Sequence, residues 1–276
     1  MGLFTGKKGL ILGVANDWSI AWHIARTIMD DGGVCGFSHL PDRPDDERRK
    51  NRGRVSKCTE KYPDGARFLM PLDVQKDEDI AAIMAKAKEE FGQLDFLLHS
   101  IAFATLDDIK KETIACSRDG FKLAMDISAY SLLAVCNAAK EIMAPTSSIL
   151  TLTYFGGERI VAGYNIMGVC KATLDACMKY AAYELGPRGI RVNALSAGPL
   201  KTLASSAVGA KDMESLYASV APLGRNITHD EVGRVGAFLL SDASCGITAE
   251  ILHVDGGYNA MGSPGRLLDQ VKAPAK

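Results

Sequence analysis

Short apolar runs rich in β-branched residues alternate with segments of helical periodicity from one end of the chain to the other. A parallel sheet produces this alternation, because helices cover both of its faces and bury its strands. We therefore expect an α/β fold with one doubly wound, seven-stranded parallel sheet. The expected strands are Lys8 to Leu12, Val34 to Ser38, Arg67 to Met70, Phe96 to Ser100, Ser148 to Thr153, Arg191 to Leu195 and Ile251 to Val254. The expected helices are about Ser19 to Asp31, Asp77 to Phe91, Arg118 to Met143, Tyr164 to Leu185 and Thr228 to Leu240.

The composition favours one compact domain that acts on a small or protein-carried substrate. The 276 residues are 47% hydrophobic, and 32 basic residues balance 33 acidic ones, so neither nucleic acid nor an anionic membrane is an expected partner. No apolar run reaches the roughly 18 residues that span a bilayer, and the first residues lack a signal-peptide pattern, so the expected location is the cytoplasm. The expected domain covers residues 1–262, and a C-terminal tail follows at 263–276.

The spacing of cysteine and histidine residues indicates neither a disulfide framework nor a metal site. The seven cysteines include no C-x-x-C pair, and the five histidines do not cluster with carboxylates, so we expect reduced thiols and no metal. Two stretches lack a regular pattern. Residues 41–54 form a charged loop leading into a helix, and residues 197–211 are a candidate substrate lid after a strand.

The turn between the first strand and the first helix is a candidate dinucleotide site. Gly13 ends the strand, and Ser19 and Ile20 open the helix. A glycine lets a ligand approach the backbone closely, and free N–H groups at a helix start favour a pyrophosphate. The usual G-x-G-x-x-G fingerprint is absent, because positions 15 and 18 are alanine and tryptophan. An ordinary strand-to-helix turn with Ser19 as its N-cap is therefore an equally good interpretation of this segment alone.

Two further strand ends strengthen the dinucleotide interpretation. Asp73 and Val74 follow the third strand, and Ser100 and Ile101 end the fourth. An aspartate can accept a hydrogen bond from the adenine amino group, and small residues permit close backbone approach. Several strand ends that meet at a topological switch point are typical of dinucleotide binding by a Rossmann-type sheet.

The end of the second strand leaves the choice of cofactor open. Leu40 stands there, and no Asp or Glu is available to pair with the ribose 2′-hydroxyl. Arg43, Arg48 and Arg49 lie nearby in sequence, although a solvated charged surface is the simpler role for most of these arginines. NADH and NADPH both remain possible.

A tyrosine and a lysine form the candidate catalytic pair. Tyr164 and Lys171 are seven residues apart, which on a helix places them on one face, roughly 10.5 Å apart in rise. When hydride reaches the β-carbon of an α,β-unsaturated thioester, negative charge develops on the thioester oxygen, and a neutral phenol can donate a hydrogen bond to it. Lys171 can bind ribose hydroxyls and add positive potential. Tyr180, Tyr183 and Tyr217 are expected to be packing residues.

These residues resemble the enoyl-acyl carrier protein reductases of the FabI type, a divergent branch of the short-chain dehydrogenases. The similarity extends from Gly6 to about Gly257. It is carried by the Gly13 turn, Asp73-Val74, Ser100-Ile101, Tyr154, Tyr164, Lys171, Arg191-Val192-Asn193-Ala194, Ser196-Ala197-Gly198-Pro199 and His253-Val254-Asp255-Gly256-Gly257.

The resemblance implies an activity, a cofactor and partners. It implies a homotetramer that reduces trans-2-enoyl groups on acyl carrier protein in fatty-acid elongation, with NADH favoured over NADPH. It implies that Tyr164 stabilises the enolate, that Lys171 binds the cofactor ribose, and that Tyr154 faces the thioester. It places Ala104 in the acyl pocket and assigns further cofactor contacts to Leu200, Lys201, Thr202, Leu203 and Ala204. Many members that use NADH carry a polar residue where this chain has Leu40.

Two alternatives remain open from the sequence. A short-chain alcohol or carbonyl reductase would share the fold and the lysine, but such enzymes place tyrosine and lysine four residues apart, and position 168 here is glycine. A dinucleotide sensor without catalytic activity would bind the cofactor and turn nothing over.

Overall fold

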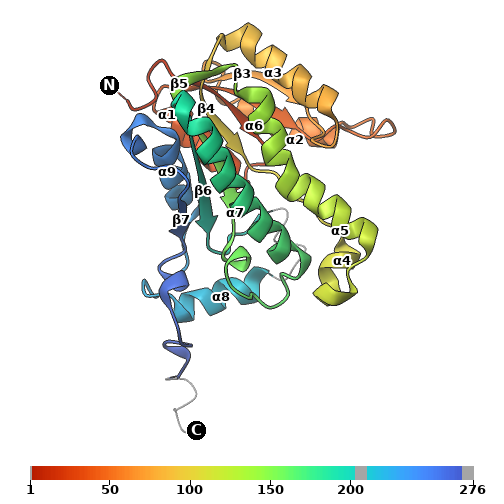
Figure 1. The fold of residues 1–276 in the computed structure, drawn as a ribbon, viewed down its shortest axis with the longest axis vertical. Helices are drawn as coiled ribbons and strands as arrows, with labels where there is room; N and C mark the ends of the chain where they lie inside the picture. Colours follow the sequence, from red (N-terminus) through yellow and green to blue (C-terminus); the bar gives the residue numbers. More distant parts are fainter. Residues whose placement is uncertain (1, 203–209, 269–276) are drawn as a thin grey trace.

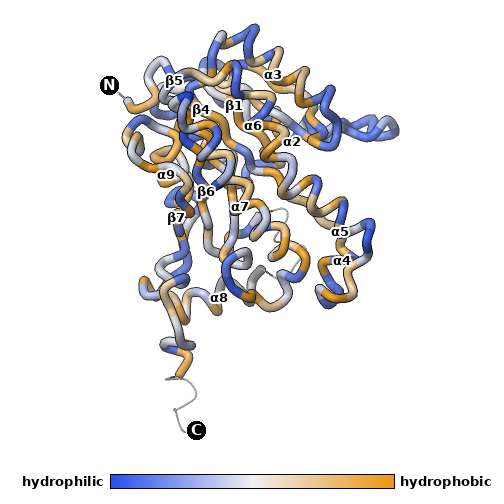
Figure 2. Tube along the Cα trace, viewed as in Figure 1, coloured by the Kyte–Doolittle hydropathy of each residue, from blue (hydrophilic) through white to orange (hydrophobic). Residues whose placement is uncertain are grey.

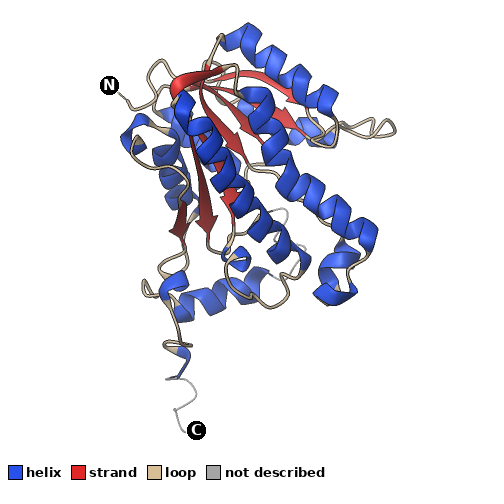
Figure 3. Cartoon of the chain, viewed as in Figure 1, coloured by secondary structure: helices blue, strands red, loops and turns tan. Residues whose placement is uncertain are grey.

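The seven strands of the sheet are all parallel and follow the order β3-β2-β1-β4-β5-β6-β7. Figure 3 shows the strands in red among the blue helices. The computed structural model describes residues 2–202 and 210–268, with the side chains of residues 210–214 left out. The strands are β1 (Lys8–Leu12), β2 (Val34–His39), β3 (Ala66–Pro71), β4 (Leu94–His99), β5 (Met143–Thr153), β6 (Arg191–Ala197) and β7 (Ile251–Val254). The strand order reverses between β1 and β4, and the predicted fold class is confirmed.

Helices cover both faces of this sheet (Figure 1). Helices α3 (Asp77–Phe91), α6 (Ser131–Ala139) and α7 (Ile166–Leu185) pack on one face, and α1 (Ile20–Asp30), α2 (Lys50–Thr59) and α9 (His229–Leu240) pack on the other. Within β1, Leu10 and Leu12 belong to the first core and Ile11 to the second, so the apolar run of this strand fills both layers.

Three further helices lie outside these two layers. Helices α4 (Leu106–Lys110) and α5 (Arg118–Met125) follow β4, and α8 (Ala210–Val220) precedes α9. Figure 2 shows the segment before α2 as hydrophilic, in agreement with the predicted charged loop. No helix in the described part of the chain is long and apolar enough to cross a membrane.

The predicted helix from Arg118 to Met143 forms, but it ends earlier and is not α-helical throughout. It runs without a break through α5, a π-helical turn at Asp126–Tyr130 and α6, and β5 begins at Met143 instead of Ser148. In the π-helical turn, Ser128 Oγ accepts a hydrogen bond from the Phe103 N–H (2.9 Å) and donates one to the Phe103 carbonyl (2.9 Å). This pairing attaches the π-helical turn to the chain after β4, 25 residues earlier.

The start of β5 is irregular, which explains why the sequence pattern shows the strand only from Ser148. Pro145 lies within the strand, and Thr146 has a φ of 71°. The register between β4 and β5 also shifts between Leu94 and Phe96. A proline and a left-handed residue hide the alternation that identifies a strand.

Candidate active site

Ser19 holds the strand-to-helix turn after β1 together through hydrogen bonds to the backbone of the turn. Its Oγ accepts hydrogen bonds from the N–H groups of Ala15 (3.0 Å) and Asn16 (3.1 Å). Ser19 occupies the N-cap position of α1 but makes no side-chain bond to the helix, so its side chain does not act as the predicted helix cap. The serine instead folds the turn, and α1 begins at Ile20.

Position 13 requires glycine for two reasons, the conformation of its backbone and the closeness of Ser100. Its φ is +99°, and a Cβ at this position would collide with the carbonyl oxygen of Ser100. Its N–H donates to Ser38 Oγ at 3.3 Å. β1, β2 and the chain after β4 therefore approach one another closely at the reversal of strand order, where open α/β sheets bind ligands.

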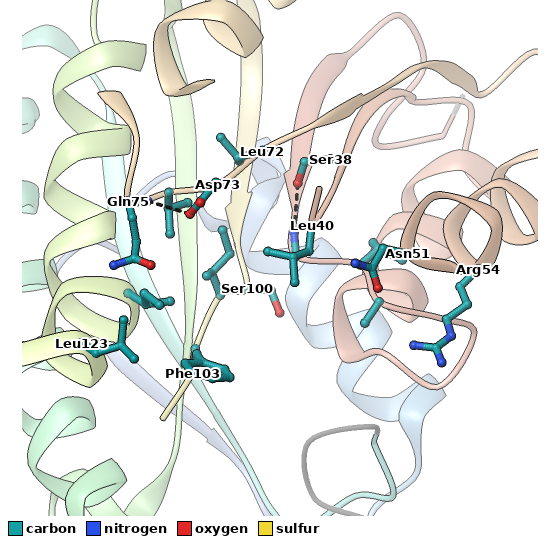
Figure 4. A pocket seen from close by; sticks show the side chains of 17 residues that line it. Ser38, Leu40, Asn51, Arg54, Leu72, Asp73, Gln75, Ser100, Phe103 and Leu123 are labelled. Atoms are coloured by element: carbon teal, nitrogen blue, oxygen red, sulfur yellow. Dashed lines mark hydrogen bonds between the residues drawn. The ribbon is translucent and has the colours of Figure 1, made fainter. Parts of the chain in front are cut away.

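A cavity of about 460 Å³ opens at the carboxyl ends of the first four strands (Figure 4). Six residues predicted to bind the cofactor line it together: Gly13, Leu40, Asp73, Val74, Ser100 and Ile101. Asp73 is held by its own loop, because its N–H donates to Asp79 Oδ2 (3.0 Å) and its Oδ1 accepts from the Gln75 N–H (3.1 Å). Ser19 and Ile20 shape the adjoining turn and are not among the lining residues.

Two lining residues on α2 were missed by the sequence analysis. Asn51 and Arg54 line the cavity, whereas Arg43, Arg48 and Arg49 do not (Figure 4). Asn51 is held in place, because its N–H donates to Asp42 Oδ1 (2.7 Å) and its Nδ2 donates to the Pro41 carbonyl (3.1 Å). The signal available in the sequence was their spacing of three residues, which places both on one face of a helix.

Lys171 is buried at the second turn of α7, with 6% of its surface exposed. Its Nζ donates to the carbonyl of Leu152 in β5 at 2.7 Å, which fixes the ammonium at the carboxyl end of that strand. Burial lowers the pKa of Lys171 to about 8, and the nearby carboxyl of Asp175 opposes this shift. Burial also raises the pKa of Asp175 to about 6.

Tyr154 and Tyr164 lie edge to face at the end of β5. Their ring centroids are 4.8 Å apart, and the ring planes meet at 70°. Burial raises the pKa of both phenols above the usual range of tyrosine, so both stay neutral and can donate hydrogen bonds. Tyr164 lies in the turn before α7, because Asn165 has a φ of 45° and the helix begins only at Ile166. The prediction that both Tyr164 and Lys171 lie on the helix is therefore wrong.

Ala104 packs beside this tyrosine. It is buried in a small apolar cluster with Ala124, Ile166, Met167 and Cys170, against which Tyr164 packs. Ala104 also directly follows Phe103, which lines the cavity. The predicted acyl-pocket residue and the predicted enolate donor therefore share one apolar surface.

The chain after β6 returns to the turn that follows Gly13. The ammonium of Lys201 lies over the ring of Trp18, 4.8 Å from the ring centroid. The backbone carbonyl oxygen of Lys201 is 3.0 Å from His229 Nε2. Leu200 is buried next to this segment, and Thr202 is half-buried. The predicted contacts Leu203 and Ala204, and residues 203–209 of the predicted lid, lie outside the described residues. Across the described residues, no group of three or more His, Cys, Asp or Glu could hold a metal ion.

The sequence and the fold of this chain both match known enzymes. The family described as "Enoyl-(Acyl carrier protein) reductase" matches residues 13–259. The NADH-dependent reductase FabI of Nostoc is 47% identical over 94% of this chain and 98% of its own length, and that of Bacillus cereus is 44% identical over 95% and 100%.

Solved structures agree with this match. The Bacillus cereus reductase in complex with NADP+ and an indole naphthyridinone superposes with a TM-score of 0.90, at 43% identity over 95% of this chain and 100% of that one. The Anaplasma phagocytophilum reductase in complex with NAD gives a TM-score of 0.86, at 40% identity over 95% of this chain and 97% of that one. The resemblance noted in the sequence is thus confirmed, and the chain belongs to the enoyl-acyl carrier protein reductase family.

Proposed function

We propose that this chain reduces trans-2-enoyl groups carried on acyl carrier protein to saturated acyl thioesters in fatty-acid elongation, with NADH as the reductant. One observation carries the proposal. The neutral phenols of Tyr154 and Tyr164 lie edge to face at the end of β5, where the buried ammonium of Lys171 is also fixed. Relatives that are 40–47% identical over nearly their whole length are named as NADH-dependent reductases of enoyl-acyl carrier protein.

The cavity fits a dinucleotide. It lies where the order of parallel strands reverses, and the missing side chain of Gly13 leaves the strand ends free to approach each other. When bound, the nicotinamide cofactor supplies the hydride. Asp73 and Ser100 line the cavity. Asp73 is assigned to the adenine amino group, Ser100 permits close approach of its backbone to the cofactor, and Lys171 is assigned to the nicotinamide ribose. Arg54 supplies a cation at the cavity rim, which is compatible with some use of NADPH.

The residues at the end of β5 have separate roles in this proposal. As hydride reaches the β-carbon of the substrate, charge builds on the thioester oxygen, and the Tyr164 hydroxyl donates a hydrogen bond to it. The ammonium of Lys171 adds positive potential from a buried position, where low dielectric strengthens its effect. Tyr154 orients the thioester, and Ala104 lines the path of the acyl chain.

The proposed reaction is tested by following the loss of NADH absorbance with crotonyl and longer enoyl thioesters. The same assay with NADPH compares the two cofactors, and we expect the larger kcat/KM with NADH. A panel of secondary alcohols tests the alternative carbonyl reductase activity. An enzyme that binds NADH but reduces no enoyl thioester would contradict the proposal and would favour a sensor.

The activity is expected to decline as pH rises above about 8. Burial lowers the pKa of Lys171 to about 8, so the side chain is charged below that pH and neutral above it. The proposed role requires the charged form, and kcat/KM for NADH should therefore fall about tenfold for each pH unit on the alkaline side. The decline should be absent from the residual activity of Lys171→Arg, because a guanidinium does not titrate in this range. A flat profile for the unmodified enzyme would contradict this role.

A homotetramer is the proposed assembly. Tyr180 and Tyr183 were predicted to be packing residues, but they are 69% and 82% exposed on α7, and Tyr130 on the π-helical turn is 54% exposed. Burial of these rings between subunits would remove this exposed surface from water. Light scattering should give four times the monomer mass, and a monomer would contradict the assembly. The cytoplasmic location and the domain limits at 1–262 stay predictions.

A further inference from the structure

A stack of tyrosines connects α8 to the active site. Tyr217, on α8, is only 1% exposed. Its ring lies flat on that of Tyr258, with centroids 3.7 Å apart and planes within 13°. Its hydroxyl is 2.8 Å from the hydroxyl of Tyr154. Figure 1 shows α8 crossing below the carboxyl ends of β6 and β7, so three segments far apart in sequence meet at these rings.

The hydroxyl of Tyr217 has one hydrogen-bond partner within the described part of the chain, and that partner is Tyr154. Burial raises the pKa of both phenols, so each hydroxyl keeps its proton at neutral pH. The carboxylate of Asp255 lies near the pair, but its oxygens already accept from the N–H groups of Gly257 (2.9 Å) and Asn259 (2.8 Å). A buried hydroxyl that lacks a partner costs free energy, so the pair is expected to persist.

The direction of this hydrogen bond has a chemical consequence. If Tyr154 donates to Tyr217, its only proton is used within the pair. If Tyr217 donates to Tyr154, the proton of Tyr154 is free to reach an acceptor in the substrate pocket. In such a chain, the first bond polarises the second and strengthens it.

We propose that Tyr217 is a positioning residue for the reduction, which donates to Tyr154 and leaves the proton of Tyr154 directed at the thioester carbonyl. The inference rests on the proposed function, in which Tyr154 contacts the substrate. It adds a role for α8, because Tyr217 lies on this helix. The hydrogen bond that Tyr217 donates leaves the proton of Tyr154 free for the substrate. Tyr217 touches neither substrate nor cofactor in this scheme and acts through Tyr154 alone.

The test is a double-mutant cycle with Tyr154→Phe and Tyr217→Phe. Tyr217→Phe keeps the ring stacked on Tyr258 and removes only the hydroxyl, so the fold should be retained. We expect kcat with an enoyl thioester to fall about 5- to 20-fold, with the KM for NADH unchanged. In the Tyr154→Phe background, the same substitution should change kcat by less than about twofold, because the group through which it acts is gone.

Tyr258→Phe is the matched control, because it removes a hydroxyl from the same stack of rings but leaves the hydrogen bond between Tyr154 and Tyr217 in place. The kcat of this variant should stay within about twofold of that of the unmodified enzyme. Additive losses in the cycle, or a normal kcat for Tyr217→Phe, would overturn the role of Tyr217 while leaving the proposed reduction intact. An unmodified enzyme without enoyl-thioester turnover would overturn the proposed reduction itself, and the role of Tyr217 with it.

Discussion

Lys171→Met is expected to lower kcat/KM about 1,000-fold and to weaken NADH binding. The methionine keeps much of the length and the apolar stem of lysine but removes the ammonium that donates to the Leu152 carbonyl. It therefore removes charge-assisted hydrogen bonds to the cofactor ribose and the positive potential beside the thioester oxygen. Steady-state kinetics and a fluorescence titration with NADH measure the two effects separately.

Lys179→Met is the matched control for this substitution. Lys179 lies on the same helix, two turns further along, and is exposed. Its replacement should change kcat/KM by less than about twofold. Because burial makes the charge of Lys171 costly in the folded protein, the Lys171→Met variant should still fold, which thermal unfolding can verify. Unchanged NADH affinity in this variant would refute the assignment of Lys171 to the ribose.

The sheet could be predicted because its signal is local. Each buried parallel strand is a short apolar run, and each crossover is a helical segment. The order of elements along the chain is therefore visible in the pattern of apolar residues alone. The cofactor-side residues Gly13, Asp73 and Ser100 were found for the same reason. They stand at strand ends, and the carboxyl ends of parallel strands meet at one edge of the sheet.

The missed features depend on contacts between distant segments. The helix predicted at residues 118–143 takes a π-helical turn where Ser128 bonds to Phe103, 25 residues earlier. Tyr217 was expected to be a packing residue because a single tyrosine on a helix usually is, yet its hydroxyl bonds to Tyr154, 63 residues away. Arg54 was overlooked in favour of Arg43, which lies nearer in sequence to the end of β2. Helical geometry, and not sequence distance, brings Arg54 to the cavity.

Tyr164→Phe is expected to lower kcat with an enoyl thioester about 100-fold and to leave the NADH dissociation constant unchanged. The phenylalanine keeps the ring that packs edge to face on Tyr154 and beside Ala104, so the apolar surface of the pocket should persist. The hydroxyl alone is lost, and with it the hydrogen bond to the oxygen on which charge develops. An interaction that forms only as charge develops affects kcat and not ground-state binding.

Tyr183→Phe is the control for removal of a tyrosine hydroxyl. Tyr183 lies near the far end of α7 from Lys171, and phenylalanine keeps the ring for the proposed subunit contact, so kcat should change by less than about twofold. The outcome for Tyr164→Phe also separates the two tyrosines at the end of β5. If kcat is intact in Tyr164→Phe but falls about 100-fold in Tyr154→Phe, the enolate donor is Tyr154. The hydrogen bond from Tyr217 would then act on the residue that stabilises the developing charge, and the loss in Tyr217→Phe should be correspondingly larger.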